Sequence, residues 1–174
     1  MGAVVPVTLL LGGARSGKSR LAETLAKESG KAVCYLATAP RYEEDAEWQS
    51  RIVKHQQQRP QHWQVIEEPL DLVGALDGEQ HQTELILVDC LTLWLSNLMF
   101  AEKDVTAEVD NLCKMLAAYA GDVVLVSNEV GMGLAAESSL GRQFCDEQGR
   151  LNQAVAEAAD HVLFVAAGLP LTLK

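Results

Sequence analysis

The sequence predicts an α/β fold: a single domain over residues 1–174, with a mostly parallel sheet and helices on both faces. Two observations lead to this prediction. Short runs rich in Val, Leu and Ile alternate with stretches of helical hydrophobic spacing, which is typical of βαβ units. The chain has 174 residues, of which 48% are hydrophobic and 22% charged, a mixture that suits one globular core.

The first part of the chain predicts three strands and one clear helix. The Leu and Ala residues of that helix recur on one stripe, and Gly30 ends it. In order, the expected elements are a strand over 4–11, a helix over 17–29, a strand over 32–37, a weakly helical polar segment over 43–55 and a short strand over 63–66.

The second part continues the alternation. The expected elements are a strand over 85–88, helices over 91–100 and 109–119, a strand over 123–126, a helix over 141–160 and closing strands over 161–165 and 171–173. The segment 91–100 is apolar nearly all round, so we expect it to be buried or to lie in a subunit interface. Residues 74–82 are polar, and we expect a surface loop there.

The strongest motif is a full match to G-x-x-x-x-G-K-[ST], placed between an expected strand and an expected helix. Such a loop turns its N–H groups towards a triphosphate, and the following helix adds its positive end. The loop residues expected to bind nucleotide are Gly12, Gly13, Ala14, Arg15, Ser16, Gly17, Lys18 and Ser19. The motif therefore predicts a nucleoside-triphosphate site. We expect the fold to be that of a P-loop NTPase, of the RecA-like kind.

A magnesium ion is the cofactor that this loop implies. Lys18 can reach the β- and γ-phosphates, and the Ser19 hydroxyl can ligate Mg²⁺. Asp89 ends the apolar run 85–88 and is the natural partner for the metal or its waters. An ordinary loop or capping role for Asp89 remains the alternative.

The charge and hydrophobicity of the chain limit the kinds of partner and the cellular location that we expect. The 24 acidic and 14 basic side chains give a net charge of −10, which disfavours nucleic acid and anionic membranes as partners. No apolar stretch approaches the ~20 residues that span a bilayer. The four cysteines form no CxxC pair and are expected to be reduced. We therefore expect a cytoplasmic protein.

Two further segments carry polar residues that suggest chemistry. His55 lies among basic residues, and a neutral imidazole near bound phosphates can attack phosphorus. A solvated surface histidine is the alternative. Asn128 and Glu129 follow the strand over 123–126, where α/β proteins bind ligands. They could position a metal-bound water, the substrate or a neighbouring subunit, or form only a polar loop.

Several motifs occur together in one order. They are GGARSGKS at 12–19, YLATA at 35–39, R-I-x-x-H-x-x-x-R-P-x-x-W at 51–63, SNEVGMG at 127–133 and GRLNQ at 149–153. In this combination the chain closely resembles the bifunctional adenosylcobinamide kinase/adenosylcobinamide-phosphate guanylyltransferase family of cobalamin biosynthesis, over residues 7–174.

The resemblance implies a homotrimeric enzyme with two steps. ATP or GTP first phosphorylates adenosylcobinamide. His55 then takes GMP from GTP and passes it to adenosylcobinamide phosphate, which gives adenosylcobinamide-GDP. His55 and Lys18 are the expected catalytic residues. Beyond the loop, the implied nucleotide contacts are Ala37, Thr38, Ala39, Gln56, Gln57, Gln58, Arg59, Glu67 and Asp89.

Three alternatives stay open at this point. The first is a regulatory P-loop GTPase, although residues 127–130 lack the Lys and Asp of the guanine motif N-K-x-D. The second is a small-molecule kinase without guanylyl transfer. The third is a chain that has kept only the guanylyltransferase step.

Overall fold

The computed structural model of the protein describes residues 6–40, 60–79 and 84–174. In these ranges the chain forms a seven-stranded sheet in the order β3-β2-β4-β5-β1-β6-β7. All neighbouring strands are parallel except β7, which pairs antiparallel with β6. The strands are β1 (Val7–Gly12), β2 (Val33–Ala37), β3 (Gln64–Glu67), β4 (Leu85–Asp89), β5 (Asp122–Asn128), β6 (His161–Ala166) and β7 (Leu169–Thr172).

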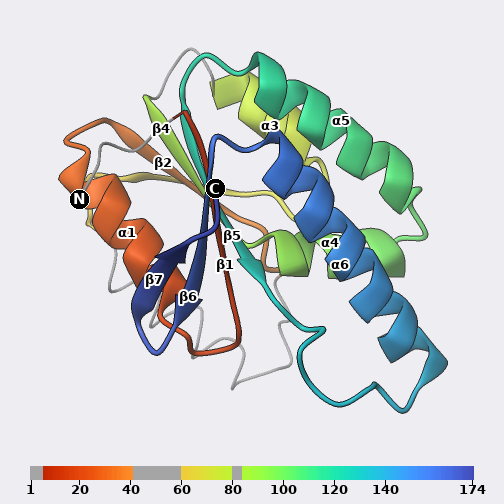
Figure 1. Ribbon diagram of the computed structural model, residues 1–174. Helices are drawn as coiled ribbons and strands as arrows, with labels where there is room; N and C mark the ends of the chain where they lie inside the picture. The colour runs from red at the N-terminus through yellow and green to blue at the C-terminus, as the bar shows by residue number, and fades with distance from the viewer. Residues whose placement is uncertain (1–5, 41–59, 80–83) are drawn as a thin grey trace.

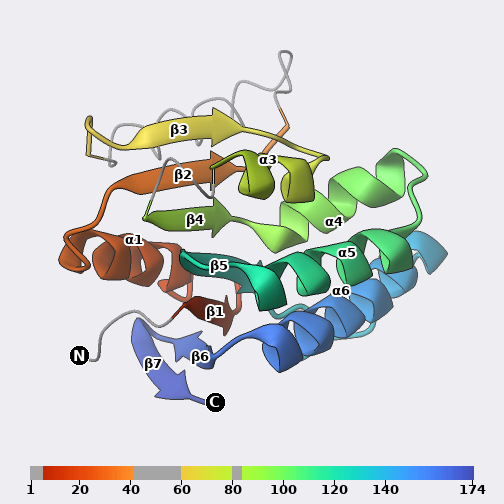
Figure 2. The same cartoon turned by 90° about the horizontal axis from the view of Figure 1, so that it is seen from above.

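Helices cover both faces of this sheet (Figures 1 and 2). One face is covered by α1 (Lys18–Glu28), and we call it the α1 face. The other, the α6 face, carries α3 (Leu72–Glu79), α4 (Leu91–Phe100), α5 (Val105–Ala118) and α6 (Ser139–Ala158). The predicted fold class, a mostly parallel α/β sheet with helices on both faces, is confirmed.

The side chains of β5 show how a strand serves the two faces. Val123 and Leu125 belong to the core of the α6 face, and Val124 and Val126 to the core of the α1 face. This alternation follows from the pleat of a β-strand, in which successive side chains point to opposite sides. The same rule assigns faces to the polar residues that end the strands.

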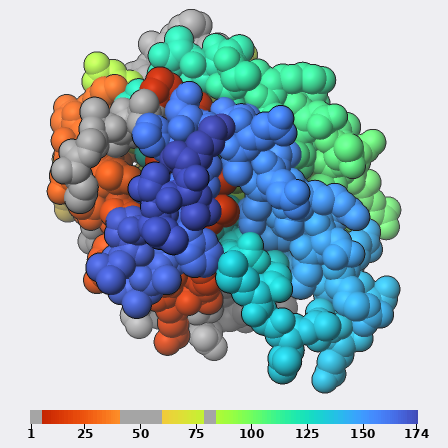
Figure 3. Space-filling model, viewed as in Figure 1, coloured from red at the N-terminus to blue at the C-terminus, as the bar shows by residue number. Residues whose placement is uncertain are grey.

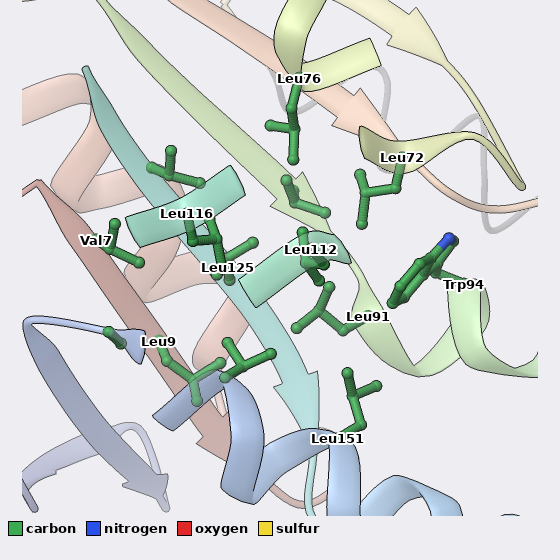
Figure 4. Close-up of a cluster of buried hydrophobic side chains, with 14 of the residues drawn as sticks. Val7, Leu9, Leu72, Leu76, Leu91, Trp94, Leu112, Leu116, Leu125 and Leu151 are labelled. Atoms are coloured by element: carbon green, nitrogen blue, oxygen red, sulfur yellow. The ribbon is translucent and has the colours of Figure 1, made fainter. Parts of the chain in front are cut away.

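The core of the α6 face is the larger of the two. Figure 4 shows Leu91 and Trp94 from α4, Leu112 from α5 and Leu125 from β5 in this cluster of buried side chains. These four side chains are fully buried. Burying such a side chain contributes about 1.5–3 kcal/mol, so the α6 face is expected to supply much of the stability. In the apolar segment 91–100, the side chains of Leu91, Trp94, Leu95 and Leu98 are buried in the chain's own core, whereas Phe100 at its end is exposed.

Most predicted elements lie within a few residues of those observed, with one clear error. The segment expected to be a surface loop over 74–82 forms helix α3 up to Glu79. Leu72 and Leu76 lie one turn apart and are fully buried against the α6-face core. The Asp71 carboxylate accepts a hydrogen bond from the backbone N–H of Gly74 at 3.0 Å and so begins the helix. Residues 43–55 lie outside the described ranges.

The sheet closes with the hairpin of β6 and β7, which lies on the face shown in Figure 3. Its turn, Ala167–Gly168, has positive φ at both residues, 52° and 79°. Leu169, Leu171 and Leu173 along this last segment are exposed. In the part of the chain that the structure describes, no helix is long and apolar enough to cross a membrane.

Candidate nucleotide-binding site

The phosphate loop Gly12–Ser19 connects β1 to α1, and its shape depends on glycine. Gly17, the residue before α1, has φ 99°, a left-handed conformation that L side chains rarely adopt. A Cβ added there would also lie only 3.0 Å from the Cα of Gly168. Inside the loop, the backbone N–H of Ser16 donates to the carbonyl of Gly13 at 3.2 Å. The loop thus forms the compact turn that its sequence motif predicts.

Two other segments hold this loop in place. The backbone N–H of Glu129 donates to the Gly12 carbonyl at 3.0 Å, and that of Gly168 donates to the Ser16 carbonyl at 2.7 Å. A side chain on Gly12 would collide with the carbonyl oxygen of Val165. The end of β5 and the β6–β7 hairpin therefore fix the loop from two sides.

Lys18 is a buried cation at the start of α1, only 7% exposed. Its ammonium group donates to the Gly13 carbonyl at 2.9 Å. Burial lowers the pKa of Lys18 below its ordinary value of 10.5, and negative charge near it opposes the change. Burial also raises the pKa of Cys90 to about 12, so this thiol is neutral and the opposing charge is that of Asp89. Lys18 and Asp89 therefore lie close enough to interact electrostatically.

Asp89 ends β4 on the α1 face, because Leu85 and Leu87 of the same strand belong to the core of that face. One of its carboxylate oxygens accepts a hydrogen bond from the Tyr35 hydroxyl at 2.7 Å. The other carboxylate oxygen has no hydrogen-bond partner among the described residues. Asp89 is half-buried, as is Ser19 in the first turn of α1.

These oxygens suit a magnesium ion. Carboxylate, hydroxyl and phosphate oxygens are the ligands that Mg²⁺ prefers, and it commonly keeps several waters and takes one or two protein ligands. No group of three or more His, Cys, Asp or Glu side chains that could hold a metal is found in residues 6–40, 60–79 and 84–174. An ion here would thus rely on Ser19, Asp89, water and the phosphates of a nucleotide.

Three of the predicted nucleotide contacts end neighbouring strands at the same level. Ala37 of β2 is in register with Glu67 of β3 on one side and with Asp89 of β4 on the other. Glu67 is exposed at the outer strand, four strand positions from β1. With strands about 4.8 Å apart, that is roughly 19 Å from the strand that leads into the phosphate loop.

Thr38 has a structural role in this arrangement. Its side chain is fully buried, and its hydroxyl donates to the Cys90 carbonyl at 2.7 Å and accepts from the Cys90 N–H at 2.9 Å. Its carbonyl accepts from the Asn97 amide at 2.8 Å. The turn after β2 is therefore tied to the start of α4, and Ala39, half-exposed, is its more accessible predicted contact.

A pocket that the sequence analysis did not predict lies beside this turn. Its volume is about 550 Å³, and it is lined by Pro40, Pro69, Leu70, Asn97, Phe100 and Ala101. The residues come from the ends of β2 and β3 and from α4, which are far apart in the chain. No local pattern marks such a pocket, because only the register of the sheet brings its walls together.

The sequence analysis also did not predict a buried polar network that joins β5 to α6. The Ser127 hydroxyl donates to the Asn152 side-chain oxygen at 2.7 Å. The Gln148 amide donates to both Ser127 and Asn152 at 3.0 Å. Asn152 in turn donates to the Asn128 carbonyl at 3.0 Å. One signal was visible: two amides one helical turn apart, beside the apolar Leu151 and Val155.

Five predicted residues cannot be placed in this geometry. They are His55, Gln56, Gln57, Gln58 and Arg59, all outside the residues that the structure describes.

The fold and the loop define the class of the protein. A mostly parallel sheet with the loop between its inner strand β1 and helix α1 is the framework of a P-loop NTPase. The chain is similar in structure to a prototypical ATPase from the type III secretion system of pathogenic bacteria, with a TM-score of 0.57 and 11% identity over 95% of this chain and 56% of that one. This chain thus spans about half the length of that ATPase. It is also similar to a protein from Pyrococcus horikoshii OT3, with a TM-score of 0.54 and 12% identity over 98% and 88% of the two chains.

Within this class, the sequence comparisons are more specific. The family described as cobinamide kinase / cobinamide phosphate guanyltransferase matches residues 8–173, and the chain belongs to this family of enzymes. It is 48% identical to the bifunctional adenosylcobalamin biosynthesis protein CobP of Pseudomonas aeruginosa, over 95% of this chain and 96% of that protein. It is 38% identical to the bifunctional adenosylcobalamin biosynthesis protein CobU of Escherichia coli K12, over 95% and 98%.

Proposed function

We propose that this protein phosphorylates adenosylcobinamide and then converts the product to adenosylcobinamide-GDP through a guanylylated histidine. The observation that carries the proposal is the phosphate loop with Lys18 and Asp89 beside it, in a chain that matches the family along nearly its whole length. The described ranges contain one such loop, so the same loop serves both reactions.

In the kinase step, a hydroxyl oxygen of adenosylcobinamide attacks the γ-phosphorus of ATP or GTP. The bond from that phosphorus to the β–γ bridging oxygen breaks, the nucleoside diphosphate leaves, and the hydroxyl proton passes to solvent. Lys18 and the loop N–H groups offset the negative charge on the phosphates. Magnesium, bound through Ser19 and Asp89, would neutralise phosphate charge in the same place.

In the guanylyl step, a neutral ring nitrogen of His55 attacks the α-phosphorus of GTP. The α–β bridging bond breaks, pyrophosphate leaves, and the imidazole loses its N–H proton to solvent as the phosphoramidate forms. An oxygen of adenosylcobinamide phosphate then attacks the same phosphorus and the P–N bond breaks. The leaving ring nitrogen takes a proton back from solvent, which restores the neutral imidazole and gives adenosylcobinamide-GDP. Two displacements by positioned nucleophiles replace one difficult transfer.

The arrangement of the strand ends supports this use of the loop. The triphosphate occupies the loop at β1, and the nucleoside extends along the strand ends towards Ala39 and Glu67. Gln56, Gln57, Gln58 and Arg59 follow the nucleophile in the sequence and complete the nucleotide contacts in this proposal.

The test uses GTP labelled at the α-phosphate. The wild-type protein should acquire the label, release pyrophosphate, and transfer the label to adenosylcobinamide phosphate when it is added. His55→Ala should acquire no label, and His62→Ala, a change at an exposed histidine seven residues further along the chain, should behave as the wild type. Label on His55→Ala would contradict the proposal. Slow GTP hydrolysis without pyrophosphate would instead indicate a regulatory GTPase.

The proposal extends to assembly and location. We propose a homotrimer that works in the cytoplasm, and the exposed apolar side chains of Leu169, Leu171 and Leu173 are consistent with self-association. Light scattering of the purified chain measures the number of subunits directly.

A further inference from the structure

Asn128 lies on the strand between Asp89 and the phosphate loop, the two parts of the candidate nucleotide site. Strand β5 lies between β4, which ends at Asp89, and β1, which leads into the phosphate loop. Asn128 is in register with Gly12, the first residue of that loop. Asp89 is in register with Val126, two residues before Asn128 on the same strand. Asn128 therefore lies directly beside the start of the phosphate loop and two residues beyond the position opposite Asp89.

The pleat of β5 puts the Asn128 side chain on the α1 face. Val124 and Val126 pack in the core of that face, and Ser127 bonds to α6 on the opposite face. Asn128 comes two residues after Val126, so its side chain lies on the same α1 face, as the side chain of Asp89 does on β4. Lys18 starts α1 on this same face, so the amide, the carboxylate and the ammonium group share one side of the sheet.

The backbone of Asn128 is held on both sides by buried side chains. Its N–H donates to the Thr92 hydroxyl at 2.8 Å, and its carbonyl accepts from the Asn152 amide at 3.0 Å. Thr92 and Asn152 are 8% and 6% exposed. Strand β5 thus ends in a rigid position, which is what a precise contact with a reacting group requires.

The side-chain amide of Asn128 is half-buried and makes no hydrogen bond to any described residue. The next residue differs: the Glu129 carboxylate accepts from the N–H of Gly131 at 2.5 Å and is used within its own loop. A rigid backbone that carries an unused amide beside the phosphate loop suggests a ligand for that amide.

We propose that Asn128 contacts the terminal phosphoryl group of the bound nucleoside triphosphate through its side-chain N–H and stabilises its transfer in the kinase step. The proposal rests on the nucleotide binding and phosphoryl transfer proposed above. Lys18 reaches the β- and γ-phosphates in loops of this type, and Asp89 lies close to Lys18, so the shared side of the sheet is the γ-phosphate end. During transfer, charge spreads over the three equatorial oxygens of the phosphoryl group, and Asn128 donates to one of them.

The test compares four proteins: wild type, Asn128→Ala, Asn128→Asp and Asn111→Ala. Asn111 is an exposed asparagine on α5 and serves as the matched control. Phosphorylation of adenosylcobinamide by ATP with Mg²⁺ should slow in kcat by on the order of 10²-fold in Asn128→Ala, as for other lost oxyanion donors. The Asp variant keeps the side-chain shape, loses the donor and adds a negative charge beside the phosphates, so its kcat should fall at least as far. Asn111→Ala should match the wild type.

Two further readouts separate this role from a structural one. GDP, which has no γ-phosphate, should bind to Asn128→Ala as tightly as to the wild type, and the rate of histidine labelling by GTP should change much less than the kinase kcat. A kinase kcat within twofold of wild type would overturn the proposal, as would equal losses in labelling and phosphorylation. Should Asn128→Ala fail to fold, the Asp variant, which has the same side-chain shape, gives the same test. Absence of label on the wild type would refute the histidine intermediate and leave the kinase comparison valid.

Discussion

Two adjacent residues at the end of β5 show how differently the two faces of the sheet are used. Ser127 points to the α6 face, is fully buried, and bonds to Asn152 and Gln148. Asn128 points to the α1 face and keeps an amide that bonds to no described residue. A single strand end therefore contributes stability on one face and a group available for chemistry on the other.

The same division holds for the sheet as a whole. The large apolar core lies on the α6 face, whereas Lys18, Asp89 and Asn128 lie together at the strand ends of the α1 face. Substitutions on the α6 face should therefore lower the free energy of unfolding, and those at the strand ends of the α1 face should lower activity. Each of the following predictions tests one side of this division.

The largest effect is expected from Trp94→Ala on the α6 face. Trp94 is fully buried, and its indole N–H donates to the Leu70 carbonyl at 2.9 Å. Removing this ring should lower the free energy of unfolding by about 3–5 kcal/mol. Urea denaturation followed by circular dichroism measures the change.

Phe100→Ala is the matched control for that experiment. Phe100 is an aromatic residue of the same helix but is 73% exposed, so its removal should cost no more than about 0.5 kcal/mol. Equal losses in the two variants would show that α4 is not packed as the structure describes. A folded Trp94→Ala that has lost GDP binding would contradict the separation of the two faces.

A smaller effect is expected from Asn152→Leu, which alters the network that joins the two faces. The change removes the donor to the Asn128 carbonyl and the acceptor of the buried Ser127 hydroxyl, and it leaves the Gln148 amide with Ser127 alone, at a cost of about 1–3 kcal/mol. Gln153→Leu, at the next and exposed position, should cost less than about 0.5 kcal/mol.

Asn152→Leu also reports on the link between the faces. Because the Asn128 carbonyl loses its donor, the kinase kcat should fall, though by less than in Asn128→Ala. Urea denaturation and steady-state kinetics on the same two variants give both numbers. A variant with wild-type stability and wild-type kcat would show that the network does not position the end of β5.

The sequence predicted correctly those features that depend on residues close together in the chain, and it did not predict those that depend on residues far apart. The phosphate loop and α1 are formed by residues close together in the chain, and the pattern of those residues was sufficient to predict both elements. The fold class followed from alternating runs for the same reason. The helix α3 was misread because Gly74, Gly78 and the nearby acidic residues suggest a loop locally. The burial of Leu72 and Leu76 against the core outweighs that tendency.

The environment of Asn128 could not be predicted in this way. Its carbonyl bonds to Asn152, 24 residues along the chain, and its N–H bonds to Thr92, 36 residues before it. Both contacts exist because α4 and α6 pack on one face of the sheet in a particular register. The sequence indicated only that Asn128 ends a strand, which left its role open between several candidates.

The smallest predicted effect concerns the charge of Lys18. Burial lowers its pKa below 10.5, so the free protein loses this proton at a lower pH than an exposed lysine does. Bound phosphates favour the charged form of Lys18. At a pH where the free protein loses this proton, the complex with GDP therefore still holds it. The affinity for GDP should fall severalfold as the pH rises towards 10. Lys18→Arg, which stays charged, should lose less affinity for GDP than the wild type over the same range, because only the guanine ring of the ligand then titrates.

The stability of the protein should respond to the same proton with the opposite sign. Between the lowered pKa of the folded state and 10.5, the unfolded chain holds more protons at Lys18 than the folded one, so this residue's contribution to stability rises with pH. The difference in unfolding free energy between wild type and Lys18→Met, measured at several pH values, isolates that contribution. We expect two changes as the pH rises: the affinity for GDP falls, and the unfolding free energy of the wild type increases relative to that of Lys18→Met. Both together would identify Lys18 as the titrating group. Affinity that falls equally in Lys18→Arg would assign the pH dependence to another group and would contradict the prediction for Lys18.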